Sequence, residues 1–264
     1  MESQPLGYFA ALVKEAPAGT RYFYRLDATT DLPDPASRLQ PEGVEGPSEI
    51  VGEDFGWTDA TWKAPPFDTL VTRQVQVGSF TREGTFTAMI PKLPPLKASG
   101  ISAIELTPIS EFVGRRNSPS DSLFPAAVHA PFGGPVGLSQ LVNACHQDGL
   151  AVAVEFNYAA RDLGNYLERF GPYFSDQNLT QWGRALSFDG PSGDDVRRLF
   201  IEGALYFVDG LHVDALRFIN AQSFVDHSKR TFLEELSEGL RSRGAHFLTP
   251  RMGLLQNERG SGGA

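Results

Sequence analysis

The sequence predicts an α/β protein in which a small β-rich module precedes a parallel sheet of about five strands. From about residue 70, short strand-like apolar runs alternate with longer runs that have the repeat of amphipathic helices. Strands and helices that alternate in this way form parallel sheets through right-handed crossovers. Before residue 65 the chain is instead rich in Pro, Gly and acidic residues, which favours short strands joined by turns.

The β-rich module is expected to span residues 1–65 and to contain few regular segments. One strand is predicted over residues 20–27, which read "TRYFYRLD", and a shorter one over residues 7–13. The parallel sheet is expected within residues 70–252. The residues after it, 253–264, read as a flexible tail because they are rich in Gly and polar residues.

Within residues 70–252, the pattern predicts strands at 70–80, 101–109, 150–158, 210–216 and 245–249. Helices are predicted between them at 85–100, 134–149, 193–209 and 228–244. The first of these helices contains Pro91, Pro94 and Pro95. An interior proline removes a backbone hydrogen bond and costs roughly 3 kcal/mol, so this helix is the least regular of the four.

Composition excludes several classes of function. The 264 residues are 41% hydrophobic and carry a formal net charge of -9, which argues against general nucleic-acid binding. No apolar run is long enough to span a bilayer, and the N-terminus lacks the pattern of a secretory leader. The single cysteine, Cys145, suits a reducing compartment. We therefore expect a cytoplasmic protein without membrane or nucleic-acid partners.

Several segments resemble the maltooligosyltrehalose trehalohydrolases, a family of α-amylase-type glycoside hydrolases. The resemblance runs from about residue 7 to 250. It is carried by "GTRYFYRLD", "GSFTREGTF", "GISAIELTPISEFVGRRN", "VHAPFGGPVGL", "GNYLERFGPYFSD", "WGRALSFDGPSGDDVRRLFIEGALYFVDGLHVDAL" and "FLEEL". The resemblance implies a partial (β/α)₈ barrel of about five strands, preceded by a partial β-sandwich. It also implies retaining hydrolysis of the α-1,4 bond that joins trehalose to a maltooligosaccharide.

Under this resemblance, "VDGLHVDAL" is the fourth barrel strand and Asp214 is the catalytic nucleophile at its active end. A retaining glycosidase also needs a carboxylic acid roughly 5 Å from the nucleophile. The family's acid, a Glu after the fifth strand, aligns with Pro250, and Glu258 in the tail is a poor substitute. Hydrolysis is therefore expected to be lost or severely reduced.

Other family positions are also changed. His212 stands where the family has an arginine, and Arg217 where it has a histidine. Of the third-strand motif only Asn157 is retained, and of the motif at "NSPSDS" only Asp121. The remaining departures from the family are Gln76, Ser118, Ser120, Ala153 and Tyr158. The resemblance therefore implies substrate-binding roles for His212, Asn157, Asp121 and Arg217, and the loop aromatics Tyr166 and Trp182 are further substrate-binding candidates.

Each candidate has a structural alternative. Asp214 could be a buried acid paired with His212 or Arg217, and a histidine on a strand is more often structural than a general base. Glu155, on the same strand face as Asn157, could offer a relocated carboxylate. The loop aromatics could stack on sugar rings or pack beneath the loop; they are Tyr166, Tyr173, Phe174 and Trp182.

No cofactor or metal is expected, because His129 and His246 lack Cys or acidic partners at metal-ligand spacing. Two functions stay open. One is an impaired trehalohydrolase acting on an α-glucan or maltooligosyltrehalose. The other is a non-catalytic module, or a fragment of a longer enzyme, that binds a glucan or a protein. An open sheet of five strands also predicts self-association, or a second chain that covers the exposed edges.

Overall fold

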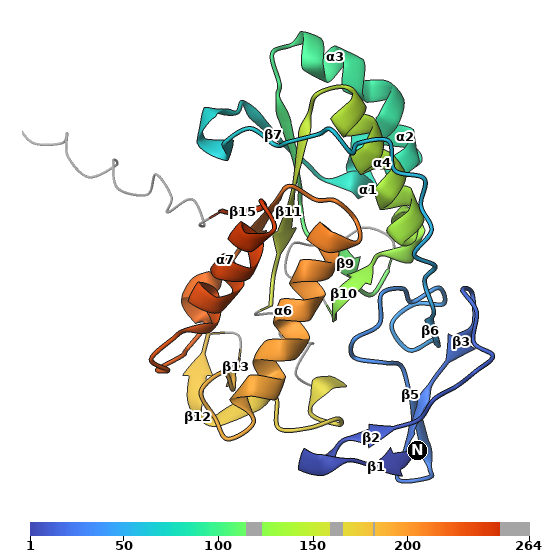
Figure 1. The fold of residues 1–264 in the computed structure, drawn as a ribbon, viewed down its shortest axis with the longest axis vertical. Helices are drawn as coiled ribbons and strands as arrows, with labels where there is room; N and C mark the ends of the chain where they lie inside the picture. Colours follow the sequence, from blue (N-terminus) through green and yellow to red (C-terminus); the bar gives the residue numbers. More distant parts are fainter. Residues whose placement is uncertain (115–122, 159–165, 182, 249–264) are drawn as a thin grey trace, which may run out of the picture.

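The computed structural model describes residues 1–114, 123–158, 166–181 and 183–248, and its centre is one parallel sheet (Figure 1). The sheet has five strands in the order β15-β14-β11-β8-β7, and every neighbouring pair is parallel. The strands are β7 (Thr72–Val75), β8 (Ala103–Leu106), β11 (Ala151–Phe156), β14 (Ala215–Phe218) and β15 (His246–Leu248). The predicted alternation of strands and helices is thus confirmed.

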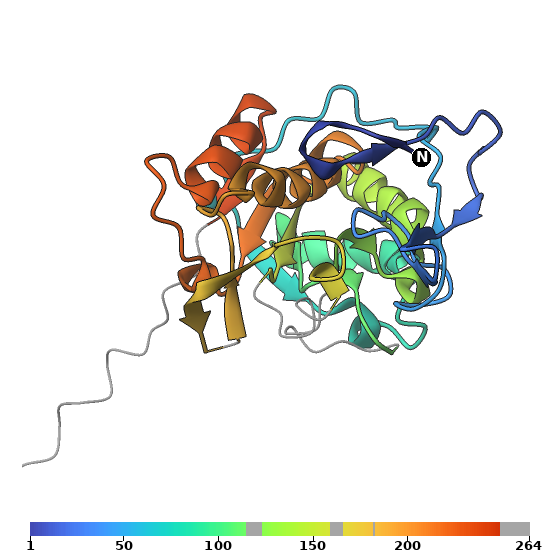
Figure 2. The same ribbon diagram turned by 90° about the horizontal axis from the view of Figure 1, so that it is seen from below.

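Three long helices cover one face of the sheet. Figure 2 shows α4 (Gly134–Gln147), α6 (Gly193–Asp209) and α7 (Phe232–Ser242) in succession beside the strands. The strand residues that face them are buried and apolar; Phe156, for example, packs against Phe207 of α6 with ring centroids 4.8 Å apart. Strand alternation therefore places Val154, Phe156, Leu216 and Phe218 on the helix side and leaves the other face of the sheet for polar residues.

The helix predicted at 85–100 is broken into three short pieces. These are α2 (Phe86–Met89), the 3₁₀ turn η3 (Ile90–Lys92) and α3 (Leu93–Ala98). Pro91 lies at the start of η3, and Pro94 at the start of α3. Proline is tolerated in a first helical turn because the missing N–H would have no helical partner there, so each break coincides with a proline.

The fourth strand differs from its prediction. The pattern predicted a strand over 210–216, but α6 continues to Asp209 and β14 begins only at Ala215. His212 has a left-handed backbone with φ of 53°, and the N–H of Val213 donates to the carbonyl of Phe207. A residue in this conformation cannot continue an extended strand. Residues 210–213 are therefore a turn, and Asp214 lies before the strand rather than at its carboxyl end.

The N-terminal residues form three separate two-stranded pairs instead of a continuous sheet. The strands are β1 (Glu2–Ser3), β2 (Phe9–Ala10), β3 (Arg21–Tyr22), β4 (Tyr24–Leu26), β5 (Thr30–Leu32) and β6 (Ser48–Glu49), paired β1-β2, β3-β6 and β4-β5. The β-sandwich assignment of residues 1–65 and the boundaries at 65, 70 and 252 stay predictions. The tail, residues 253–264, lies outside the described residues.

Two antiparallel pairs were not predicted. β9 (Ser110–Glu111) pairs with β10 (Phe124–Val128), and β12 (Phe174–Thr180) pairs with β13 (Gly183–Leu186). The β12–β13 hairpin lies between the strand predicted at 150–158 and the helix predicted at 193–209, where no regular element was predicted. The remaining short elements are α1 (Val77–Phe80) and the 3₁₀ turns η1 (Pro5–Gly7), η2 (Phe67–Thr69), η4 (Ala130–Phe132) and η5 (Ala221–Ser223). None of the helices in the described part of the chain has both the length and the apolar character to cross a bilayer.

Candidate functional site

Polar side chains occupy the face of the sheet that the helices leave free. Strand pairing places Gln74 beside Glu105, and Glu155 beside Arg217. The residue that pairs with Glu105 on β11 is Ala153, whose side chain is small. Four neighbouring strands thus bring their polar residues together in one layer, which we call the inner-face cluster: Gln74, Glu105, Glu155 and Arg217.

Hydrogen bonds cross-link the inner-face cluster over intervening strands. Gln74 Nε2 donates to Glu155 Oε1 at 2.7 Å, and Arg217 Nη2 donates to Glu105 Oε2 at 2.8 Å. Both glutamates are at most 5% exposed, and their carboxyl groups also hydrogen-bond each other. Because two ionised carboxylates can only accept, a carboxyl–carboxyl hydrogen bond requires a shared proton. The cluster can therefore hold a proton between its two acids.

Glu155 is an acid that can carry this proton near neutral pH. Burial, and secondly the hydrogen bond with Glu105, raise the pKa of Glu155 to about 7, against the opposing effects of Gln74 and Arg217. Glu155 was considered from the sequence as a relocated carboxylate. The structure gives it a partner that the sequence did not suggest, Glu105 from the neighbouring strand.

The raised pKa predicts a pH-dependent stability. The folded state holds the Glu155 proton more tightly than the unfolded state, so this group stabilises the fold fully below about pH 4.5 and loses that contribution as pH rises through about 7. In Glu155→Gln, we expect the free energy of unfolding to vary less between these pH values, by on the order of 1–3 kcal/mol. Urea titrations at several pH values measure it. The exposed Glu202→Gln is the matched control, and an equal slope in both variants would contradict the prediction.

Asp214 lies at the opposite end of the sheet from the one expected. Its backbone N–H donates to the carbonyl of Val152, at the start of β11, and its Oδ2 accepts the backbone N–H of Val152 at 2.7 Å. Its Oδ1 accepts a hydrogen bond from Trp62 Nε1 at 2.8 Å. The expectation that Asp214 stands at the active, carboxyl end of the fourth strand is therefore wrong. The misreading arose because residues 210–213 form a turn.

Asp214 belongs to a buried chain of alternating acids and histidines, which we call the amino-end network. His146 of α4 contacts Asp214 through Nε2 at 3.0 Å and Asp59 through Nδ1 at 2.8 Å. His212 Nδ1 contacts the same Asp59 carboxylate at 3.0 Å. Trp62 stacks on His146, with ring centroids 4.7 Å apart. The sequence alternative that paired Asp214 directly with His212 is thus replaced by an indirect link through two other residues.

The network favours a charged His146. Carboxylates only accept hydrogen bonds, so contacts at both ring nitrogens require both to be protonated. Burial lowers the pKa of His146, but the hydrogen bonds and charges of Asp214 and Asp59 outweigh it and hold the pKa above its usual range. Burial raises the pKa of Asp59, in the opposite direction to its effect on His146. The hydrogen bonds from His212 and His146 outweigh this effect, so the pKa of Asp59 is lowered overall. The amino-end network is therefore a structural ion cluster.

The other sequence candidates are dispersed. Asn157 follows β11 at its carboxyl end and accepts a weak hydrogen bond from Asn220 Nδ2 at 3.4 Å. Arg217 lies in the inner-face cluster, near this end. Tyr166 packs against Phe124 and donates its hydroxyl to the carbonyl of Pro33, so its ring and hydroxyl serve packing. The loop residues Asp121 and Trp182, with Ser118, Ser120, Pro250 and Glu258, lie outside the described residues.

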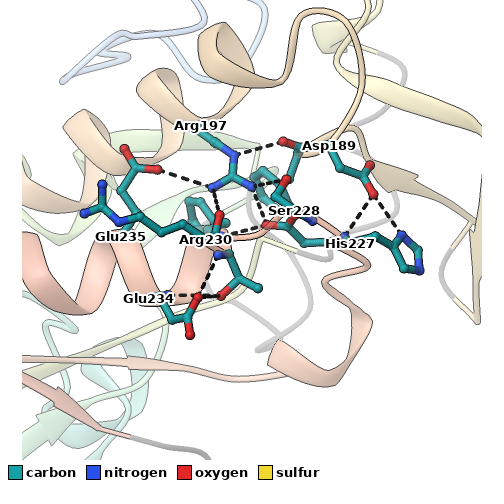
Figure 3. Close-up of polar contacts among 11 residues, drawn as sticks. Asp189, Arg197, His227, Ser228, Arg230, Glu234 and Glu235 are labelled. Carbon is teal, nitrogen blue, oxygen red and sulfur yellow. Dashed lines mark hydrogen bonds and ion pairs between the residues drawn. The ribbon is translucent and has the colours of Figure 1, made fainter.

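A further polar cluster, not predicted, lies at the loops that precede α6 and α7. Figure 3 shows the side chains that converge on Arg197 of α6, whose side chain is 7% exposed. Its Nε donates to the carbonyl of Phe188 at 2.9 Å, and its Nη2 donates to Asp226 at 2.6 Å and to Ser228 at 3.0 Å. Its Nη1 reaches the carbonyl of Arg230 and the carboxylate of Glu235. One buried guanidinium thus joins two loops and a helix.

The two loops carry an acid–histidine pair. Asp189 Oδ2 accepts the backbone N–H of His227 at 3.0 Å and contacts its ring Nδ1 at 2.8 Å (Figure 3). The backbone hydrogen bond, followed by the side-chain one, holds the pKa of Asp189 below its usual range. An ionised Asp189 makes Nδ1 the protonated ring nitrogen, so in neutral His227 Nε2 is an acceptor.

Comparison with known proteins identifies relatives that are longer than this chain. The malto-oligosyltrehalose trehalohydrolase of Saccharolobus solfataricus is 39% identical over 240 residues, which are 90% of this chain and 43% of that protein. That of Mycobacterium tuberculosis H37Rv is 39% identical over 252 residues, again 43% of its length. No family model matches the chain. The chain therefore spans less than half of the curated relatives that it matches.

Solved structures give the same picture of the fold. A Salmonella typhimurium protein provisionally assigned as an α-amylase superposes with a TM-score of 0.87 at 32% identity, covering 94% of this chain and 43% of that one. A Bacillus acidopullulyticus pullulanase, at 18% identity, covers 83% of this chain and 32% of that one with a TM-score of 0.67, and shows the fold alone. Together with the five parallel strands, these matches confirm a partial (β/α)₈ barrel. The chain is thus similar in sequence to the malto-oligosyltrehalose trehalohydrolases, and it shares the barrel fold of the α-amylase family over less than half of their length.

Proposed function

We propose that this chain binds an α-1,4-glucan of the maltooligosyltrehalose type at the carboxyl ends of its strands, and that it does not cleave the glucan at the rate of an intact trehalohydrolase. The ligand class follows from the trehalohydrolase relatives. The position follows from the barrel fold, in which chemistry is built on the loops after the strands.

The arrangement of carboxylates on the inner face supports binding without cleavage. Retaining hydrolysis needs two carboxyl groups roughly 5 Å apart, one of them free to attack the sugar. Among the described residues of the inner-face cluster, the two acids are Glu105 and Glu155, and they hydrogen-bond each other. Arg217 also bonds Glu105, and Gln74 bonds Glu155, so neither carboxyl group is free. By strand alternation, the next residue on the same face after Arg217 is Ile219, which follows β14 and has no carboxyl group. This pairing of the two acids is the observation that carries the proposal.

A non-catalytic role as a protein-interaction module is the second candidate. Among the described strands, β7 and β15 are at the two ends of the order and each pairs on one side only. Unpaired strand edges are sites where another chain can add. The self-association expected from the sequence stays a prediction, as does the cytoplasmic location.

Incubation with maltotriosyltrehalose tests the proposal. We expect calorimetry to detect binding and sugar analysis to detect little or no trehalose. Without a free acid and nucleophile the rate should fall at least ~10²–10⁴-fold below that of an intact trehalohydrolase run in parallel. The exposed surface variant Asp31→Asn should bind equally well. Trehalose release at the rate of the intact enzyme would refute the proposal, and so would the absence of binding at millimolar ligand.

A further inference from the structure

A polar cavity of about 530 Å³ lies between the β12–β13 hairpin and the loops that precede α6 and α7. It is separate from the inner-face cluster, since none of the four residues of that cluster lines it. The side chains that line it include one aromatic ring and several amide and hydroxyl groups: Phe174, Gln177, Asn178, Ser187 and Ser192. Asp189 and His227 complete its polar edge.

His227 presents a defined hydrogen-bonding group to this cavity. Its Nδ1 is occupied by Asp189 Oδ2 at 2.8 Å, and its side chain is 73% exposed. The carboxylate therefore fixes both the tautomer and the direction of the ring, and Nε2, on the opposite side of the ring, is free to accept a hydrogen bond from a hydroxyl group.

Arg197 contacts the residues that flank Asp189 and His227. This buried guanidinium bonds the carbonyl of Phe188, immediately before Asp189, and the side chains of Asp226 and Ser228, on either side of His227. A β-carbon at Gly193 would lie 2.4 Å from the Phe188 carbonyl oxygen, so only glycine permits this close approach. Groups fixed before a ligand arrives lose little conformational entropy on binding.

The charges of the cavity select against anions. Its lining residues include the carboxylates of Asp176 and Asp189, and none of them is Lys or Arg. Asp176 is paired with Arg184 at 2.9 Å, and the Arg184 guanidinium also lies over the Phe174 ring, 5.9 Å from its centroid. A phosphate or carboxylate ligand would therefore meet two carboxylates and a neighbouring cation that is already paired. A neutral ligand rich in hydroxyl groups would meet amides, hydroxyls, an imidazole acceptor and one aromatic ring.

We infer that this cavity binds one ring of a neutral sugar, with His227 Nε2 accepting a hydrogen bond from a ring hydroxyl and Asp189 acting as the positioning residue for His227. The inference rests on the proposed glucan binding for its class of ligand. It adds a contact site outside the inner-face cluster, on the loops at the carboxyl side of the sheet.

Maltotriose binding to the full chain tests the inference, with calorimetry for affinity and imidazole NMR signals for contact. Loss of one neutral hydrogen bond corresponds to a roughly three- to tenfold weaker affinity, which we expect for His227→Ala. His227→Gln, whose amide oxygen can accept the same hydrogen bond, should keep most of the affinity. Asp189→Ala should weaken binding as His227→Ala does, and the imidazole signals of the unmodified chain should shift on titration. Because His227 is exposed, its replacement should leave the unfolding midpoint unchanged.

The outcomes separate this inference from the proposed function. Unchanged affinity in His227→Ala, together with unshifted imidazole signals, would overturn the inference and leave glucan binding by the chain intact. No maltotriose binding by the unmodified chain would overturn both. Equal affinity for glucose and glucose 6-phosphate would overturn the assignment of a neutral ligand.

Discussion

Replacing Asp214 with alanine is expected to lower the free energy of unfolding by about 3–5 kcal/mol. The substitution removes the acceptor for the Trp62 indole N–H and the Val152 backbone N–H, and it leaves His146 with one of its two carboxylates. The Val152 N–H and the Nε2 of His146 then stay buried without a partner, and the half-buried Trp62 loses its acceptor. Because a domain of this kind is stable by only about 5–15 kcal/mol, the change is a large fraction of the total.

Urea unfolding monitored by tryptophan fluorescence measures this effect. Asp209→Asn is the matched control, since Asp209 is also an acid near β14 but its side chain is 53% exposed and bonds Arg243 at the surface. We expect the control to change stability by about 0.5 kcal/mol or less. The same experiment tests the structural role of Asp214. Unchanged stability in Asp214→Ala would contradict that role.

Replacing Arg197 with methionine is expected to destabilise the fold by a similar amount, about 3–5 kcal/mol. Methionine can fill most of the volume, but it cannot bond Asp226, whose side chain is 5% exposed and would be left as a buried carboxylate. It also releases the carbonyl of Phe188. Lysine would not restore the site, because one ammonium cannot replace the fork of donors that reaches both loops.

The neighbouring Arg198→Met supplies the comparison. Arg198 is on the same helix, but its side chain is 53% exposed and its partner is Asp195, one turn earlier. Surface ion pairs contribute about 0–1 kcal/mol, so this variant should unfold close to the unmodified chain. Thermal and urea unfolding of Arg197→Met and Arg198→Met, measured in parallel, tests this difference in stability. Equal stability would mean that the contacts of Arg197 are not retained in solution.

Local patterns predicted the helices well where the pattern and the packing agree. The predicted helix at 193–209 has the bounds of α6, because its apolar repeat matches the face that packs on the sheet. The strand after it was displaced by five residues. Residues 210–216 have the apolar pattern of a strand, but the left-handed backbone of His212 forms a turn that a hydrophobic pattern does not indicate. A displaced strand start also moved Asp214 to the other end of the sheet.

The candidate site was less predictable than the fold because its partners are distant in sequence. Glu105 carried the same signal as Asp214, an acid inside an apolar run, and it was not singled out. Arg197 was not among the residues predicted from the sequence, although it is a buried cation. Asp59 and His146 are 87 residues apart, and nothing local to either residue indicates the other. Sequence reasoning therefore found single residues such as Glu155 and Arg217, but not the contacts that join them to residues distant in sequence.

The segment that carries Asp59 and Trp62 has a consequence for how the chain folds during synthesis. Trp62 and Asp214 are separated by 152 residues, so their contact has a very high sequence separation and forms late compared with contacts within a helix. At about 5–20 residues per second, a ribosome needs roughly 8–30 seconds to add the intervening chain. During that interval Trp62 and Asp59 have neither Asp214 nor His212 to bind, and the indole is available to other surfaces. Trp62 therefore stays without its native hydrogen-bond partner until Asp214 has been synthesised.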